Sequence, residues 1–144
     1  MGCHGRDRDV IALLPLMIQV APVLTDIGRQ ALPAKGCAAY LWQTGPSPRL
    51  VAMVEADMLR IGVDGRTLVL ALTDARGEVR QGLPASADFG GNGLSATVDM
   101  AIMPQPDLVD GARVQQATLS IAHSGGDVVV VPAAGLVGCT RQAR

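Results

Sequence analysis

The chain has 144 residues, and its 12 Lys plus Arg against 13 Asp plus Glu give a formal net charge of −1. Disordered chains are poor in aliphatic residues, so a hydrophobic content of 49% predicts a folded protein, and the length predicts one domain. A near-neutral charge and one residue each of Trp, Tyr and Phe exclude a basic or base-stacking nucleic-acid surface.

The longest uncharged apolar run extends from Val10 to Leu24. A helix that crosses the bilayer needs about 20 apolar residues, so this shorter run fits the apolar region of a signal peptide better. Candidate cleavage sites end at Ala21 and at Ala34. We interpret residues 1–35 as a signal peptide-like segment with an apolar helix. A retained membrane anchor and a buried helix of a cytosolic protein are the alternatives.

Removal of that segment would leave two of the three Cys residues, Cys37 and Cys139, near the ends of the mature chain. An even pair that brackets a domain in an oxidising compartment predicts a disulfide. Two free buried thiols are the alternative, because unpaired Cys is often buried. We favour the disulfide, and with it a periplasmic or secreted protein.

From residue 36 onward, apolar residues alternate with polar ones and turn residues recur at short intervals. This pattern predicts a single all-β domain over residues 36–144, an antiparallel sandwich or barrel of about seven to nine strands. A turn is expected at 74–77 and a flexible loop at 88–93. The expected strands are 37–43, 49–55, 58–63, 66–73, 78–83, 94–102, 113–123, 127–131 and 133–139.

The clearest hairpin joins 58–63 to 66–73 through Asp64-Gly65, which supplies the two positive φ angles of a type I′ turn. A loop of this length pairs Val63 with Arg66, Ile61 with Leu68 and Leu59 with Leu70, so the apolar residues of both strands share one face. Strict alternation over 94–102 places Leu94, Ala96, Val98, Met100 and Ile102 on the buried face.

Polar residues that could form a hydrolase site cluster around the expected last hairpin, at Ser120, His123, Ser124 and Asp127. A nucleophile also needs a strained elbow and donors for the oxyanion, and the pattern shows no such loop. With Gly125-Gly126 as the turn, His123 lies opposite Val128 at the domain edge. We therefore interpret His123 as a partly buried edge residue and expect no catalytic residue.

Metal and cofactor motifs are also absent from the expected β domain. One His and two Cys give no metal-ligand spacing, and the scattered Asp residues form no calcium loop. Residues 91–96 match a loose dinucleotide fingerprint, but a strand follows where that motif requires a helix. We expect no metal and no cofactor.

The candidate binding surface consists of Tyr40, Trp42, Phe89 and Asn92. Tyr40 and Trp42 share a strand face with Ala38. Exposed, they would form a contact patch; buried, they would be the largest side chains of a core short of aromatics, and we favour burial. The loops at 88–93 and 103–111 are the long connections most able to carry binding.

Several short strings resemble a group of small exported proteins of Gram-negative bacteria. They are KGCAAYLW at 35–42, LVAM at 50–53, VDGRTL at 63–68 and GLVGC at 135–139. The resemblance implies a periplasmic β domain and assigns neither an activity nor functional residues.

Taken together, these patterns predict a non-catalytic exported domain that binds an unknown envelope protein or a small ligand. A periplasmic inhibitor or small-ligand carrier is one alternative, and a small hydrolase that uses His123 is another. A membrane contact is expected only through an uncleaved N-terminus.

The signal-peptide interpretation predicts that the exported protein begins between Pro22 and Cys37, because the apolar run is short for an anchor. Intact-mass measurement of the purified protein checks this. A soluble cytosolic protein that retains residues 1–24 would contradict it.

Overall fold

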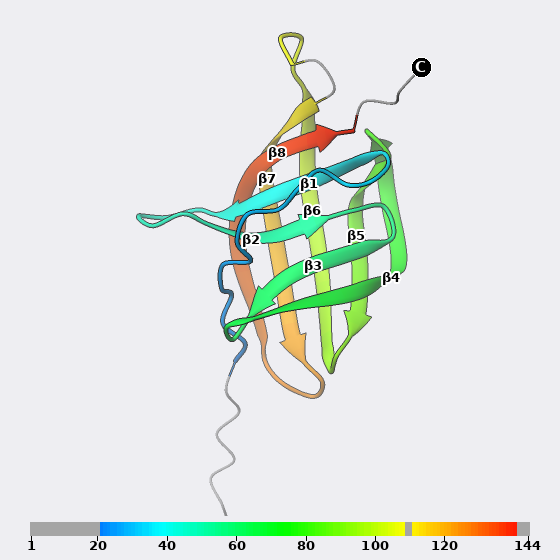
Figure 1. Cartoon of the computed structure of the whole chain (residues 1–144). Coiled ribbons are helices and arrows are strands. Elements are labelled where there is room, and N and C mark those ends of the chain that lie inside the picture. The colour runs from blue at the N-terminus through cyan, green and yellow to red at the C-terminus, as the bar shows by residue number, and fades with distance from the viewer. Residues whose placement is uncertain (1–20, 109–110, 141–144) are drawn as a thin grey trace, which may run out of the picture.

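Eight antiparallel strands close into a barrel in the computed structural model, which describes residues 21–108 and 111–140 (Figure 1). Each strand pairs with its neighbours in the chain, and the last pairs with the first. The expected all-β class and strand number are confirmed, and the architecture is the barrel. The strands are β1 (Cys37–Gln43), β2 (Arg49–Val54), β3 (Met58–Val63), β4 (Arg66–Arg80), β5 (Leu83–Gly91), β6 (Leu94–Pro104), β7 (Gly111–His123) and β8 (Val128–Cys139).

Side chains fill the interior of the barrel. One cluster of buried apolar residues draws members from all eight strands, and no polar residue is buried among the described residues. The interior of an eight-stranded barrel is just wide enough to be filled in this way. On β6 the expected alternation is confirmed, because Leu94, Val98 and Ile102 are buried while Ser95 and Asp99 are exposed.

The hairpin between β3 and β4 has the expected register. Val63 pairs with Arg66, Ile61 with Leu68 and Leu59 with Leu70. Asp64 and Gly65 have φ angles of 52° and 82°, the left-handed conformation that a type I′ turn requires. Two further short turns, at 81–82 and 92–93, show the same pair of positive φ angles.

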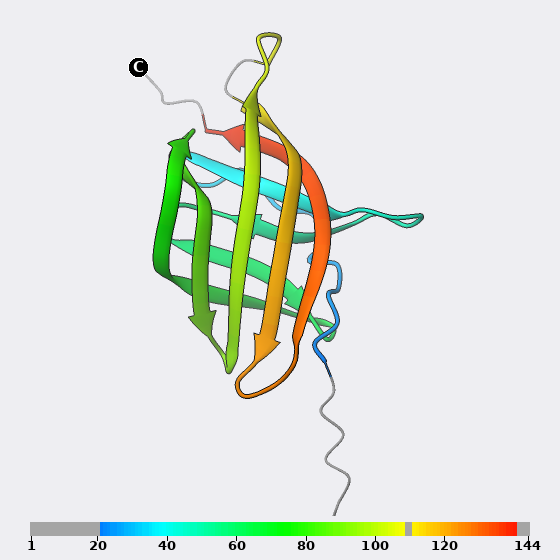
Figure 2. The same cartoon turned by 180° about the vertical axis from the view of Figure 1, so that it is seen from behind.

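Two expected connections are strands instead. β4 continues through the turn expected at 74–77. The strand expected at 78–83 comprises the end of β4, the turn at 81–82 and the first residue of β5. Gly77, with a φ of 85°, lies in a β-bulge between Arg76 and Val79, so its turn chemistry bends the strand without ending it. The loop expected at 88–93 is mostly β5, and only 92–93 turn. Figure 2 shows β4 and β5 as long neighbouring strands.

The expected strands 127–131 and 133–139 are one strand, β8. Pro132 does not break the hydrogen-bonded ladder between β1 and β8, although it has no amide hydrogen. The ladder ends with the pair of Gln43 and Ala133, just before Pro132 is reached. The hairpin register also differs by one residue. Ala122, and not His123, lies opposite Val128, since the turn is longer than Gly125-Gly126 alone.

Residues 23–33, here called the strap, cross the outer side of β2 and β3 before the chain enters β1 (Figure 1). The Thr25 amide donates to the Gly62 carbonyl at 2.9 Å, and the Ile27 amide donates to the Leu50 carbonyl at 2.9 Å. A side chain at Gly62 would place its Cβ 2.0 Å from the Thr25 carbonyl oxygen, so the close approach requires glycine.

The strap therefore packs with the barrel although it precedes residue 36, where the pattern places the start of the β domain. Cleavage after Ala21 would keep the strap, and cleavage after Ala34 would remove it. Most of the apolar run from Val10 to Leu24 lies outside the described residues; Leu24 itself forms a β-bridge with Val63. The described part of the chain contains no helix with the length and apolar character of a membrane span.

The predicted disulfide between Cys37 and Cys139 is confirmed. The two residues lie directly opposite each other on β1 and β8, with Cα atoms 4.0 Å apart and an S–S distance of 2.03 Å. The disulfide links the strand pair that closes the barrel and spans 102 positions of sequence.

Reduction of this disulfide is expected to destabilise the protein by up to about 4.7 kcal/mol, the chain-entropy value for a loop of about 100 residues. The melting temperature with and without reductant measures the effect, and the Cys37→Ala, Cys139→Ala double variant is the control that reductant should leave unchanged. Two titratable thiols in the native, unreduced protein would contradict the pairing.

Candidate functional site

The outer side of β8 is apolar along its whole length. Its outward residues, here called the β8 face, are Val128, Val130, Pro132, Ala134 and Leu136. Val128 is 62% exposed, Val130 61% and Leu136 50%. The solvated face of an antiparallel sheet is normally polar, so a contiguous apolar strip there is a candidate contact surface.

Trp42 extends this surface onto β1. The register places Trp42 beside Ala134 and Tyr40 beside Leu136. Both aromatic side chains are half-buried on the outer side of the barrel, whereas Leu41 between them is fully buried inside. The expectation that Tyr40 and Trp42 fill the core is therefore corrected. They do share a face with Ala38, as expected.

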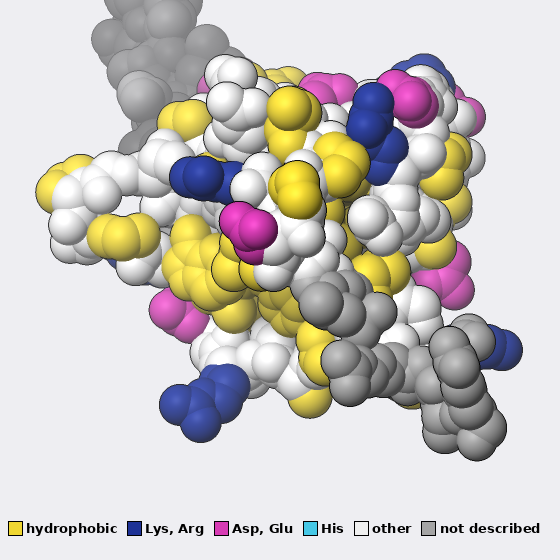
Figure 3. Space-filling model, turned by 90° about the horizontal axis from the view of Figure 1, so that it is seen from above, with side chains coloured by type: hydrophobic (Ala, Val, Ile, Leu, Met, Phe, Trp, Pro, Cys, Tyr) yellow, Lys and Arg dark blue, Asp and Glu magenta, His cyan; other side chains and the backbone are white. Residues whose placement is uncertain are grey.

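A groove of approximately 690 Å³, here called the β8 groove, opens between Trp42 and the β6–β7 loop. Figure 3 looks down on this end of the barrel and shows hydrophobic side chains beside isolated charged ones. Apolar residues line the groove with polar residues around them. The lining residues are Trp42, Gln105, Asp107, Leu108, Arg113, Val114, Gln115, Ala134, Gly135 and Leu136.

Two local irregularities shape the β8 groove. A β-bulge in β7 between Val114 and Ala117 leaves both Gln115 and Gln116 exposed. At Gly135 an added Cβ would lie 1.7 Å from the Tyr40 carbonyl oxygen, so β8 approaches β1 there as only glycine allows. Val114, where the bulge begins, pairs with Gly135, and both residues line the β8 groove.

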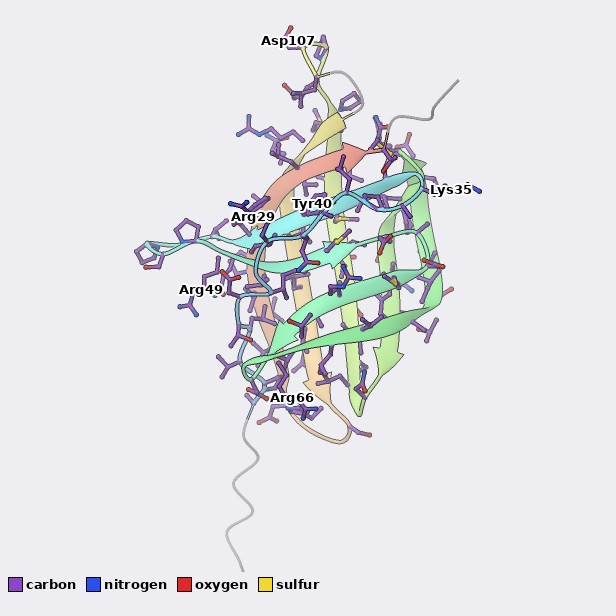
Figure 4. The ribbon with its side chains drawn as sticks, viewed as in Figure 1. Arg29, Lys35, Tyr40, Arg49, Arg66 and Asp107 are labelled. Carbon is purple, nitrogen blue, oxygen red and sulfur yellow. A yellow bond between two sulfur atoms is a disulfide. The ribbon has the colours of Figure 1, made fainter. Side chains whose placement is uncertain are left out.

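A second groove, here called the strap groove, lies on the other side of Trp42 and has a volume of approximately 380 Å³. Figure 4 labels three of its residues, Arg29 on the strap, Tyr40 on β1 and Arg49 at the start of β2. The Tyr40 hydroxyl donates to the Ala31 carbonyl at 2.8 Å. Burial is the largest cause that raises the pKa of Tyr40, so the phenol stays neutral at physiological pH.

Phe89 and Asn92 do not join Tyr40 and Trp42 in one surface. Phe89 is 1% exposed and belongs to the interior cluster. Asn92 forms the turn between β5 and β6, where its side-chain amide donates to the Val69 carbonyl at 3.1 Å. The interpretation of 88–93 as a loop misplaced Phe89, whereas Asn92 does lie in a turn.

Sequence reasoning missed the β8 face, although a signal was present. Residues 128–131 are four consecutive valines, and apolar residues continue to 137 without alternation. In an antiparallel sheet with one solvated side, such a run predicts a strand that is apolar on both faces.

His123 lies at the end of β7 with a side chain that is 42% exposed, as expected of an edge residue. Its Nε2 atom is 3.5 Å from Asp64 Oδ2, which connects β7 to the β3–β4 turn. Among the described residues, the recorded polar contact of the His123 side chain is therefore with Asp64 and not with Ser120 or Ser124. In residues 21–108 and 111–140, no three or more His, Cys, Asp or Glu side chains form a possible metal site.

The outer side of β4 to β6 carries a cluster of charged side chains, in contrast to β8. Arg76 Nη1 donates to Asp74 Oδ2 at 2.6 Å and to Asp88 Oδ2 at 2.8 Å, while Thr97 donates to Asp88 Oδ1 at 2.8 Å. The hydrogen bonds from Arg76, and next that from Thr97, hold the pKa of Asp88 below its usual range.

No known protein family, curated protein or solved structure matches the chain. Inference of function therefore rests on the β8 face, the two grooves and the chemistry of their side chains.

The lowered pKa of Asp88 predicts a pH-dependent effect of Asp88→Asn. The carboxylate contributes stability above its unfolded pKa of about 3.9, and this contribution is lost as the pH falls through the lower folded value. Asp88→Asn should therefore slightly lower the melting temperature at pH 7, and its difference from wild type should disappear under strongly acidic conditions. Asp127→Asn is the control. A difference that persists unchanged in acid would contradict the prediction.

Proposed function

We propose that the protein is a non-catalytic, exported domain that binds a protein partner of the cell envelope on the β8 face. The observation that carries this proposal is the contiguous exposed apolar strip of β8, with Trp42 beside it. Large apolar patches on a protein surface mark interaction sites, and Trp is among the residues that dominate binding energy at interfaces.

The filled interior supports an external partner over a ligand carried inside the barrel. Barrels that carry small ligands hold them in an internal cavity. Here Phe89, Leu119 and Ile121 are among the large side chains that occupy the interior, while the β8 groove opens outward. Of the alternatives, an inhibitor fits this arrangement better than a carrier, since its partner would also be a protein.

The compartment in the proposal is supported by the Cys37–Cys139 disulfide, because disulfides persist in oxidising compartments. The hydrolase alternative has less support. His123 contacts Asp64, but it lies at the other end of β7 from the β8 groove residue Arg113.

Capture from an envelope extract tests the proposal, with the purified protein as bait. Leu136→Asp and Val130→Asp should each reduce recovery of the specific partner by about tenfold or more, because a charge would be buried against an apolar contact; tenfold corresponds to about 1.4 kcal/mol. Val79→Asp is the matched control, since Val79 is 64% exposed on β4 and outside the β8 face.

Equal losses for Leu136→Asp and Val79→Asp would contradict binding at the β8 face.

His123→Ala should leave capture unchanged. If His123→Ala instead abolished an activity of the bait while its circular dichroism spectrum stayed the same, the hydrolase alternative would replace this proposal.

A further inference from the structure

We propose that the partner presents an acidic segment that crosses Trp42, with an apolar side chain in the β8 groove and a carboxylate against Arg29 and Arg49 in the strap groove. This inference rests on the proposed function and names the chemistry of its partner.

Arg29 and Arg49 belong to different elements but line the same groove. Among the described residues, no carboxylate lies within salt-bridge distance of either, whereas Arg76 and Arg80 each pair with carboxylates nearby on β4. Two exposed guanidinium groups that line one groove favour a carboxylate partner, which Arg binds through two parallel hydrogen bonds.

Backbone and side-chain hydrogen bonds hold the strap on β2 near both arginines. The Ile27 amide, two residues before Arg29, donates to the carbonyl of Leu50, the neighbour of Arg49, at 2.9 Å. Gln30 braces the same turn, because its side-chain amide donates to the Ile27 carbonyl at 2.9 Å and its carbonyl accepts from Arg60 at 2.8 Å. The backbone segments that carry the two arginines are therefore held against each other in the folded protein.

The charges that line the two grooves indicate that the carboxylate of the partner binds in the strap groove. In the β8 groove the negative charge of Asp107 offsets the positive charge of Arg113, and more than half of the lining residues are apolar or glycine. The strap groove is lined by two arginines and one carboxylate, that of Asp26. Asp26 Oδ1 already accepts a hydrogen bond from the Gly28 amide. A chain with a net charge of −1 thus presents a locally positive site.

Trp42 connects the two sites. It lines both grooves, so a segment that reaches from Leu136 to Arg49 passes over its indole ring. It is also the single Trp of the chain. Its fluorescence therefore reports occupation of this surface without a label.

The experiment uses the intact protein and an acetylated, amidated peptide of sequence Leu-Phe-Gly-Asp-Glu-Asp as probe. Trp42 fluorescence should report binding about tenfold or more tighter than that of a matched peptide with Lys at the acidic positions, and weaker binding at higher salt. The Arg29→Glu, Arg49→Glu double variant should prefer the Lys peptide. Arg66→Glu is the matched control, because Arg66 lines neither groove, and Figure 4 shows it below Arg29 and Arg49.

Equal affinity for the acidic and the Lys peptides would overturn the inference, as would an equal loss of binding in Arg66→Glu. Absence of a fluorescence change up to about 1 mM acidic peptide would also overturn it. Self-association that Leu136→Asp abolishes would identify a second copy of this chain as the occupant instead.

The inference and the proposed function fail separately. Envelope capture that depends on Leu136 but is unchanged in the double arginine variant would keep the proposed function and overturn the acidic segment. Capture lost in neither variant would overturn both.

Discussion

The pairing of β1 with β8 is the constraint on which the rest of the structure depends. It removes the free edges of the sheet, and the Cys37–Cys139 disulfide lies within it. The same pairing places Trp42 beside Ala134, residues that are distant in the chain. Closure of the barrel and formation of the proposed binding surface are therefore one event, and loss of the pairing would remove both.

Because side chains fill the interior of the barrel, a partner would bind on its outer side. On the outer side of β4 to β6, Arg76 and Asp88 form an ion pair of the kind that a solvated face favours. The β8 face departs from that pattern, and nothing in the packing of the barrel requires Val128 or Val130 to be apolar, because both point away from the interior. The proposed partner would cover these residues and so account for them.

Local patterns predicted what depends on local chemistry. The Asp64-Gly65 turn set the register of its hairpin, and alternation identified the buried side of β6. Gly77 misled the prediction because a bulge and a turn use the same positive φ angle. The choice of barrel over sandwich, the course of the strap and the meeting of Trp42 with β8 depend on pairings between distant residues, which alternation alone does not specify. The strap groove was missed for the same reason.

The central claim is that the outer side of β8 is the surface that binds. Methyl NMR of the intact protein, titrated with the partner recovered from envelope extract, tests it most directly. The account predicts that the methyl signals of Val128, Val130 and Leu136 shift or broaden on binding, while those of Val69 and Val79, which are equally exposed elsewhere on the barrel, stay in place. Shifts at Val69 and Val79 with unchanged signals on the β8 face would contradict it.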